Sequence, residues 1–390
     1  MSTAVVFGAG GIGRGFVGAL CAQAGWRVVF VDVAEGLVGR LAADGGYRLI
    51  EVSSAGERIT PITGVSALLL GDEDAVVAAL VEADLVATAV GAENLPPVAR
   101  LLALGLAARR SAGRGGLDAL VCENLHDAPA VLRRLIDEQA GAALAPVGLA
   151  RTSIGRMVPV QLPDADHPAD VRVEPYSFLP YEASALVGEQ PAIPGLVPVS
   201  ESFDLFADRK LYLHNMGHAM LAYLGEAAGL TYIWEAAERF DLRYFVRNAM
   251  VEAACALAQT YATPVAPLLR HVDDLLARFR NPGLGDTTAR VGRDPVRKMQ
   301  PGDRLLGAYT LCMDADVAPL YVTLAVALGT RRLSAEPGWD QEKAMAFVAS
   351  HLGRDDDGYL SDLVDELGTG LDADALQRLI DSRFAVSRVV

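Results

Sequence analysis

Near the amino terminus, residues 3–13 read Thr3-Ala4-Val5-Val6-Phe7-Gly8-Ala9-Gly10-Gly11-Ile12-Gly13. The apolar run 3–7 predicts a buried strand, and residues 8–13 form the pattern G-x-G-x-x-G directly after it, where a helix is predicted to begin. In this pattern the first glycine permits a tight turn, the second lets the backbone approach a pyrophosphate, and the third allows close helix–strand packing. The helix N-terminus adds N–H donors and a positive dipole for the phosphates. The predicted cofactor-binding residues of this loop are Phe7, Gly8, Ala9, Gly10, Gly11, Ile12, Gly13 and Arg14.

Asp32 indicates which dinucleotide the loop would bind. It ends the second predicted strand, residues 27–32, and follows Gly8 by 24 residues. A carboxylate at this place accepts hydrogen bonds from the adenosine ribose hydroxyls and repels a 2′-phosphate. No Arg or Lys follows Asp32 until Arg40. We therefore expect NAD rather than NADP. A flavin is the competing ligand, although nothing else in the sequence indicates one, and a ligand-free glycine turn is the remaining alternative.

The first half of the chain alternates predicted strands and helices. Residues 84–91 and 119–122 have the composition of buried parallel strands, with an Ala/Leu-rich helix between them. Residues 47–59 alternate apolar and polar side chains and predict a hairpin, and residues 171–174 predict a later strand. Strands separated by helices of this kind predict an α/β fold with a doubly wound parallel sheet of the Rossmann type.

A Pro-rich and weakly patterned stretch, residues 189–199, marks the expected domain boundary. From Phe203 onward the chain shows long helical periodicity and almost no β-branched runs. Examples of this periodicity are residues 232–261, 267–280 and 319–332. We therefore expect a Rossmann-type NAD-binding domain over residues 1–195 and a mainly α-helical substrate and catalytic domain over residues 196–390.

Composition argues against several classes of protein. The 390 residues carry 34 basic and 49 acidic side chains, a formal net charge of −15, which argues against a nucleic-acid partner. No apolar run approaches the ~20 residues that span a bilayer, and the N-terminus lacks a secretory pattern. The four cysteines lie far apart, with no histidine at metal-binding spacing. We expect a cytoplasmic protein with reduced thiols, no metal site and no membrane partner.

The most informative segment of the second half is residues 209–218, which read Arg209-Lys210-Leu211-Tyr212-Leu213-His214-Asn215-Met216-Gly217-His218. On an α-helix, Asn215 would lie about 140° and His218 about 80° from Lys210, so the three polar groups would share one broad face. A desolvated lysine could act as a general base toward a hydroxyl, while the amide and the imidazole hold the oxygen whose charge changes during hydride transfer. The alternative is an ordinary polar helix surface with a hydrogen-bonded histidine.

Residues 290–304 form a basic stretch in an otherwise acidic chain. Its basic side chains are Arg290, Arg293, Arg297, Lys298 and Arg304, against Asp294 and Asp303. Such a run can be a solvated charged face. The guanidinium group of an arginine can also bind two oxygens of a phosphate at once, so the stretch would suit a sugar phosphate.

Taken together, these motifs resemble the polyol-specific long-chain dehydrogenases, and most closely the members that act on mannitol 1-phosphate. The matching pieces, in chain order, are residues 7–15, 88–91, 122–124, 209–218 and 278–305. The resemblance implies a Rossmann domain joined to a largely helical domain, with a metal-independent, NAD-dependent active site in the cleft between them. It implies an oxidoreductase that interconverts mannitol 1-phosphate and fructose 6-phosphate, and the small members of the family lead us to expect a monomer.

The resemblance also implies residue roles. Lys210 would be the general acid/base, and Asn215 and His218 would bind the reacting oxygen. Val90 and Asn124 would lie near the nicotinamide end of the cofactor. The implied substrate-binding residues are Glu123, which would lie near the proton path, Arg290 and Lys298. Without the resemblance, Glu123 and Asn124 would be read as an ordinary loop at a strand end.

The chain departs from the family pattern on two segments, residues 151–159 and 174–180. Positions where the family pattern has acidic residues carry Arg151 and Gly155, which removes a hydrogen-bond acceptor for a polyol hydroxyl. The substrate therefore stays open between mannitol 1-phosphate and another polyol, a hexuronate or an unusual sugar phosphate. An alternative from a different class is a non-catalytic NAD-binding sensor protein.

Overall fold

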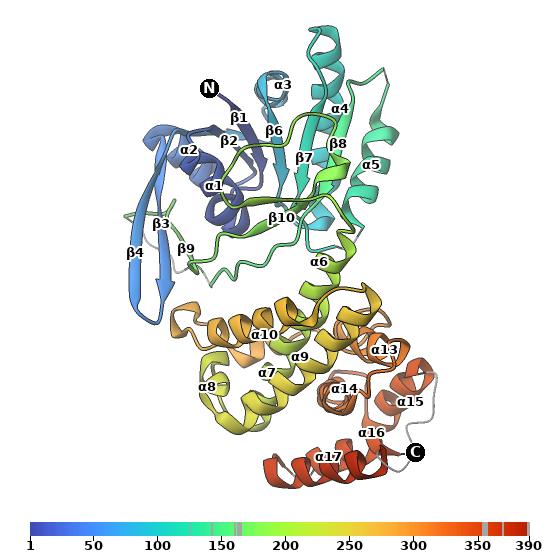
Figure 1. Ribbon diagram of the computed structural model, residues 1–390. Coiled ribbons are helices and arrows are strands. Elements are labelled where there is room, and N and C mark those ends of the chain that lie inside the picture. The colour runs from blue at the N-terminus through green and yellow to red at the C-terminus, as the bar shows by residue number, and fades with distance from the viewer. Residues whose placement is uncertain are drawn as a thin grey trace. The chain divides into compact units, whose positions relative to one another are not determined.

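The chain forms two compact units, Met1–Ala207 and Asp208–Val390, in the computed structural model (Figure 1). The structure describes residues 1–125, 127–141, 143–159, 161, 166–352, 358–368 and 370–387. The division between the units falls inside α6 (Asp204–Arg209). The boundary expected between residues 195 and 196 stays a prediction.

A six-stranded parallel sheet forms the centre of the first unit, in the order β5-β2-β1-β6-β7-β8. Its strands are β1 (Thr3–Phe7), β2 (Arg27–Asp32), β5 (Val65–Leu69), β6 (Leu85–Thr88), β7 (Leu117–Val121) and β8 (Val147–Arg151). The chain builds the sheet outward from β1 in one direction and from β6 in the other. The direction therefore reverses between these two strands, and ligands of such sheets bind at that point, beside the carboxyl ends of the strands. The predicted doubly wound sheet is confirmed.

Helices cover both faces of this sheet (Figure 1). The helices α1 (Ala19–Gln23) and α2 (Glu35–Asp44) contribute to the apolar core on one face. Across the sheet lie α3 (Glu73–Glu82), α4 (Leu95–Ser111) and α5 (Ala128–Gln139). Along β1, Val6 belongs to the first core, whereas Val5 and Phe7 belong to the second. A strand buried on both faces needs apolar residues at every position, which explains the continuous apolar run near the amino terminus.

Two smaller sheets complete the first unit. The predicted hairpin is confirmed as β3 (Gly46–Ser53) and β4 (Gly56–Thr63), which pair antiparallel. The predicted later strand is β9 (Val171–Val173), which pairs parallel with β3. The second small sheet pairs β10 (Leu179–Glu182) with β11 (Leu196–Val199).

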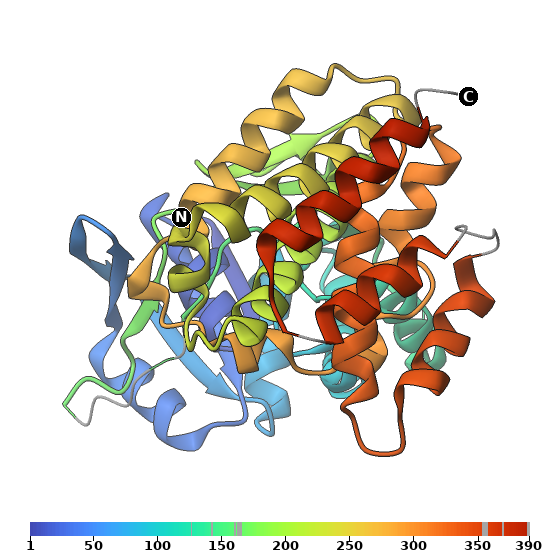
Figure 2. The same ribbon diagram turned by 90° about the horizontal axis from the view of Figure 1, so that it is seen from below.

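The second unit is helical, as the sequence predicts. Its helices of eight residues or more are α7 (Met216–Ala227), α9 (Phe240–Thr260), α10 (Val265–Phe279), α13 (Leu306–Asp314), α14 (Leu320–Ser334), α15 (Gln341–Leu352), α16 (Tyr359–Gly368) and α17 (Ala373–Ser387). Shorter helices are α8 (Ile233–Glu238), α11 (Thr288–Gly292) and α12 (Pro295–Lys298). Most of α14 is buried, and Figure 2 shows α17 running across the outside of this unit, where it contacts α14 and α16. Among the described helices, none has the length and apolar character that crossing a membrane requires.

Candidate active site

The glycine loop is packed so tightly that two of its glycines tolerate no side chain. Gly8 has φ +90°, and a Cβ atom on it would lie 2.3 Å from the carbonyl oxygen of Ala89. A Cβ atom on Gly13 would lie 1.8 Å from the carbonyl oxygen of Gly8. In contrast, a Cβ atom on Gly10 would meet nothing within 4 Å. The open space at Gly10 fits the role of the second glycine, which lets a pyrophosphate approach the backbone.

Arg14 stabilises this loop through hydrogen bonds made inside the protein. Its side chain is 7% exposed and donates hydrogen bonds to the carbonyl oxygens of Ala9, Ala169 and Asp170. Its own carbonyl oxygen accepts a 2.6 Å hydrogen bond from the Tyr47 hydroxyl. The guanidinium is thus engaged with the protein backbone, and a direct role at the cofactor stays a prediction.

Asp32 lies beside the glycine loop at the carboxyl end of β2. Its Oδ2 accepts a 2.6 Å hydrogen bond from the backbone N–H of Ala9, and its Oδ1 accepts one of 3.0 Å from Ala34. The structure therefore brings together the glycine loop and Asp32, the two parts of the predicted cofactor site that the sequence indicated separately. Because β1 and β2 are adjacent and parallel, their carboxyl ends meet at one edge of the sheet.

Glu123 and Val90 meet at the neighbouring strand ends. The buried carboxylate of Glu123 accepts hydrogen bonds from the backbone N–H groups of Val90 (3.0 Å) and Gly91 (2.8 Å). Val90 in turn lies against the glycine loop, since a Cβ atom on Gly8 would be 3.2 Å from its Cγ1. Asn124 follows as an exposed residue. Glu123 thus holds the β6 end in place, and its predicted contact with substrate stays a prediction.

The first departure from the family pattern, Arg151, has a local explanation. Its guanidinium forms ion pairs with Glu182 (2.8 Å) and Asp204 (2.6 Å) and lies over the ring of Phe203. The positive charge of Arg151, at a position where the family pattern has an acidic residue, is therefore neutralised by two carboxylates. The second departure, Gly155, lies against Tyr176, whose ring would be 3.2 Å from a Cβ atom at this position.

Arg156 is a structural residue that sequence reasoning did not single out for the site. It is buried and donates hydrogen bonds to the carbonyl oxygens of Gly15 (2.7 Å) and Glu174 (2.9 Å). It also pairs with Glu51 at 3.2 Å. Gly15 belongs to the π-helical turn Gly13–Gly18, so Arg156 anchors the segment that follows the glycine loop.

In the second unit, Lys210 and Asn215 begin and end a π-helical turn, residues Lys210–Asn215. The expectation of an α-helix, with Asn215 about 140° from Lys210, is therefore wrong here. The i→i+5 hydrogen bonds of a π-helix widen the turn, so residues five positions apart lie closer to the same face of the helix. Such turns are rare and occur often at functional sites. Burial, and next the charge of Arg304, lowers the pKa of Lys210 to about 8.

His218 is held as a neutral imidazole. Its ring stacks on Phe279 with centroids 4.9 Å apart and planes 9° from parallel. Burial lowers its pKa to about 3, and nearby positive charges, with that of Arg290 the largest, act in the same direction. Its Nε2 lies 3.7 Å from Oδ2 of Asp286, a buried acid that sequence reasoning did not identify.

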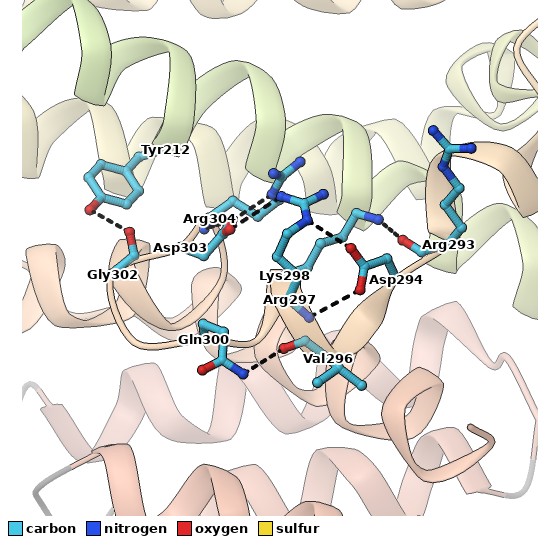
Figure 3. A network of polar contacts seen from close by, with 10 residues as sticks. All are labelled: Tyr212, Arg293, Asp294, Val296, Arg297, Lys298, Gln300, Gly302, Asp303 and Arg304. Atoms are coloured by element: carbon cyan, nitrogen blue, oxygen red, sulfur yellow. Dashed lines mark hydrogen bonds and ion pairs between the residues drawn. The ribbon is translucent and has the colours of Figure 1, made fainter. Parts of the chain in front are cut away.

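The structure separates the basic stretch into two groups. Arg297 is exposed and paired with Asp294 (2.8 Å) and Asp303 (3.4 Å), as Figure 3 shows. Lys298 is buried and donates to the carbonyl oxygen of Arg293. Burial lowers the pKa of Lys298 to about 8. The cations whose charge reaches His218 are Arg290, Arg304, Lys298 and Arg278.

The rarity of lysine in the sequence would have strengthened the predictions for Lys210 and Lys298. The chain contains three lysines, Lys210, Lys298 and Lys343, against 31 arginines. Lys343 is exposed on α15, whereas the other two have pKa values lowered to about 8. Arginine does not give up its proton in proteins, whereas a desolvated lysine can, so a rare lysine in such a chain is a candidate for proton transfer.

Two models of one protein family match most of the chain. The family model for the mannitol dehydrogenase Rossmann domain matches residues 2–195, and the model for the mannitol dehydrogenase C-terminal domain matches residues 202–338. The chain belongs to the mannitol dehydrogenase family. The predicted polyol dehydrogenase family, the two-part fold and the enzyme class are thereby confirmed.

Relatives and solved structures agree with this family. A mannitol-1-phosphate 5-dehydrogenase of Caldanaerobacter subterraneus is 34% identical over 334 residues, covering 84% of this chain and 86% of the relative. One from Brevibacillus brevis is 37% identical, covering 83% and 84%. The fold is similar to Pseudomonas fluorescens mannitol 2-dehydrogenase in a ternary complex with NAD and D-mannitol (TM-score 0.71, 17% identity, covering 98% and 94%). It is also similar to a D-sorbitol dehydrogenase in substrate-free form (TM-score 0.72, 18% identity, covering 97% and 91%).

Proposed function

We propose that this member of the mannitol dehydrogenase family is an NAD-dependent, metal-independent enzyme that interconverts mannitol 1-phosphate and fructose 6-phosphate. The observation that carries the proposal is Lys210, a half-buried lysine whose pKa desolvation lowers to about 8, in a π-helical turn that also contains Asn215. Identity of 34–37% to mannitol-1-phosphate 5-dehydrogenases over most of the chain supports the choice of substrate.

The residues of the first unit fit NAD. The open space beside Gly10 would accept the pyrophosphate, and the Asp32 carboxylate would accept hydrogen bonds from the ribose hydroxyls. A 2′-phosphate would be repelled by the same carboxylate. When bound, NAD supplies the acceptor for the hydride that the alcohol carbon loses.

The second unit would supply the proton chemistry. Because its pKa is near 8, Lys210 is partly a neutral amine at cellular pH and can take the hydroxyl proton as the carbon loses its hydride. Asn215 and the neutral His218 would hold the oxygen as it becomes a carbonyl. In the opposite direction, the ammonium form of Lys210 returns the proton to the oxygen.

The phosphate of the substrate would be bound by Arg290 and Lys298. The Nε atom of Arg290 is buried, and no group within the described residues accepts its hydrogen bond. An arginine with a buried unpartnered donor is suited to a ligand oxygen, because a phosphate would satisfy the donor that the protein leaves unused.

The decisive experiment compares Lys210→Ala with Lys343→Ala, in which the exposed lysine of α15 is replaced. Both variants should bind NADH as the wild-type protein does, measured by fluorescence titration. Lys210→Ala should lose turnover by about 10³-fold, since general acid–base catalysis contributes on this scale. Near-normal turnover in this variant would contradict the assignment.

A substrate panel followed by NADH absorbance separates the remaining alternatives. The proposal expects mannitol 1-phosphate and fructose 6-phosphate to be the best pair. Faster turnover of a hexuronate or another polyol would replace that pair while keeping the mechanism. NADH binding with no turnover across the panel would indicate the non-catalytic sensor.

A further inference from the structure

Asp286 occupies a fixed place in the second unit, between the short helices η5 (Pro282–Leu284) and α11. Its carbonyl oxygen accepts a 2.9 Å hydrogen bond from the backbone N–H of Ile233. Two residues later, the N–H of Thr288 donates a 2.9 Å hydrogen bond to the carbonyl oxygen of Thr231. These bonds join the segment to the first residue of α8 and to the loop just before it, so the backbone that carries the carboxylate has little freedom to move.

The carboxylate of Asp286 lies between two predicted site residues. Its Oδ1 forms an ion pair with Nη2 of Arg290, and its Oδ2 lies 3.7 Å from Nε2 of His218. Asp286 is 5% exposed. The 3.7 Å separation is longer than a hydrogen bond. Such contacts often shorten only when a substrate is bound.

A neighbouring group such as the Asp286 carboxylate is needed to determine which ring nitrogen of His218 carries the proton. Stacking on Phe279 sets the plane of the ring but does not choose which nitrogen carries the hydrogen. Nε2 is buried, and within the described residues it has no hydrogen-bond partner. An ionised carboxylate can only accept hydrogen bonds, so it favours the tautomer in which the facing nitrogen is N–H.

We infer that Asp286 is a positioning residue of the proposed active site, which holds Arg290 by an ion pair and keeps the neutral His218 ring in its Nε2–H tautomer. The inference rests on the proposed function, in which these two side chains bind the substrate. Asp286 links them, so the site for the phosphate and the site for the reacting oxygen share one buried acid.

The substitution Asp286→Asn gives a sharp test because it preserves shape. Arg290 can only donate, so the amide oxygen should stay on Arg290 and the amide NH2 should face Nε2 of His218. Nε2 would then become the acceptor, and the ring would change to its Nδ1–H tautomer. The matched control is Asp273→Asn, an exposed acid that pairs with Arg247 at 3.0 Å.

Two measurements on the full-length protein decide the matter. In ¹H–¹⁵N spectra of protein labelled at its six histidines, with the His218 signal identified by its loss in His218→Gln, the wild type should show Nε2–H and Asp286→Asn should show Nδ1–H. In steady-state kinetics with the polyol phosphate, kcat/KM of Asp286→Asn should fall by about tenfold or more, because His218 loses the carboxylate that orients its ring. Binding of NADH, and all properties of Asp273→Asn, should be unchanged.

Several outcomes would overturn the inference. They are a wild-type ring protonated on Nδ1, an Asp286→Asn protein that keeps the wild-type tautomer, and an Asp286→Asn enzyme within twofold of wild-type kcat/KM. The wild-type spectrum requires no variant, so a variant that fails to fold leaves that criterion in force. A wild-type protein that shows Nε2–H but turns over no polyol phosphate would defeat the proposed function alone.

Discussion

The backbone N–H of Ala9 donates a 2.6 Å hydrogen bond to Oδ2 of Asp32. This bond joins the glycine loop to the end of the neighbouring strand before any ligand arrives. The acid that would recognise the ribose therefore also sets the shape of the loop that would receive the pyrophosphate.

We predict that Asp32→Ala weakens NADH binding more than Asp32→Asn does. Alanine removes both the ribose acceptor and the acceptor for Ala9, whereas asparagine keeps an oxygen that Ala9 can use. Loss of a hydrogen bond to a charged group, at about 1.5–3 kcal/mol, corresponds to a roughly 10- to 100-fold higher Kd. Fluorescence titration measures this, with Asp44→Asn, an exposed acid of α2, as the control. Equal affinities in all variants would show that Asp32 does not contact the cofactor.

The direction of the reaction should determine how rate depends on pH. Burial lowers the pKa of Lys210 from 10.5 to about 8, so the neutral amine forms as pH rises through 8. For alcohol oxidation kcat/KM should therefore rise with pH and level off above about 8, whereas for ketone reduction it should fall over the same range. Lys298 also has a pKa lowered to about 8, and the profile of Lys298→Met distinguishes the two. An inflection that disappears in this variant would assign the titration to Lys298 instead.

Replacing Arg290 with Ala should affect phosphorylated substrates selectively. Loss of a charge-assisted contact to phosphate should raise KM for the sugar phosphate by about 10- to 100-fold. The KM for an unphosphorylated polyol should change much less. Arg297→Ala is the matched control, because Arg297 is already paired with two acids of the same segment. A uniform loss on both substrate types would mean that Arg290 supports the fold or the chemistry rather than the phosphate.

Arg109 should be a major contributor to the stability of the first unit. Its buried guanidinium donates to the carbonyl oxygens of Leu80, Val81, Ala83, Gly115 and Gly116 at 2.8–3.3 Å. Arg109→Met would remove all five hydrogen bonds and should lower the free energy of unfolding by about 3 kcal/mol. Urea denaturation measures this against Arg110→Met, because the Arg110 side chain makes a single hydrogen bond within the described residues, of 3.4 Å to the carbonyl oxygen of Leu144. Equal stability of the two variants would contradict the prediction.

Strands that show a clear local pattern of apolar residues could be predicted from the sequence. The strands β1 and β2 are continuous apolar runs that end at glycine and at Asp32, and the hairpin of β3 and β4 alternates in the period of a strand. The strands β5 and β8 were not predicted. β5 is interrupted by Ser66, and β8 contains Gly148 and ends at Arg151, so neither shows the continuous apolar run from which β1 and β2 were predicted.

Features that depend on tertiary packing could not be predicted. The π-helical turn at Lys210 spans six residues, too few to disturb the helical period in which the sequence was read. Asp286 lies 68 positions after His218 in the sequence, and only packing places its carboxylate beside the ring. The basic stretch likewise gave no indication that Arg297 is neutralised while Lys298 is buried.

The scarcity of lysine has a practical consequence for chemical modification. Lys343 is exposed, with 63% of its side chain accessible, whereas Lys298 is 4% exposed and Lys210 is desolvated by burial. Among the lysines, amine-directed reagents applied to the folded protein will therefore react first at Lys343. A fluorophore or a surface linker attached through this lysine will sit on α15, outside the proposed catalytic turn Lys210–Asn215.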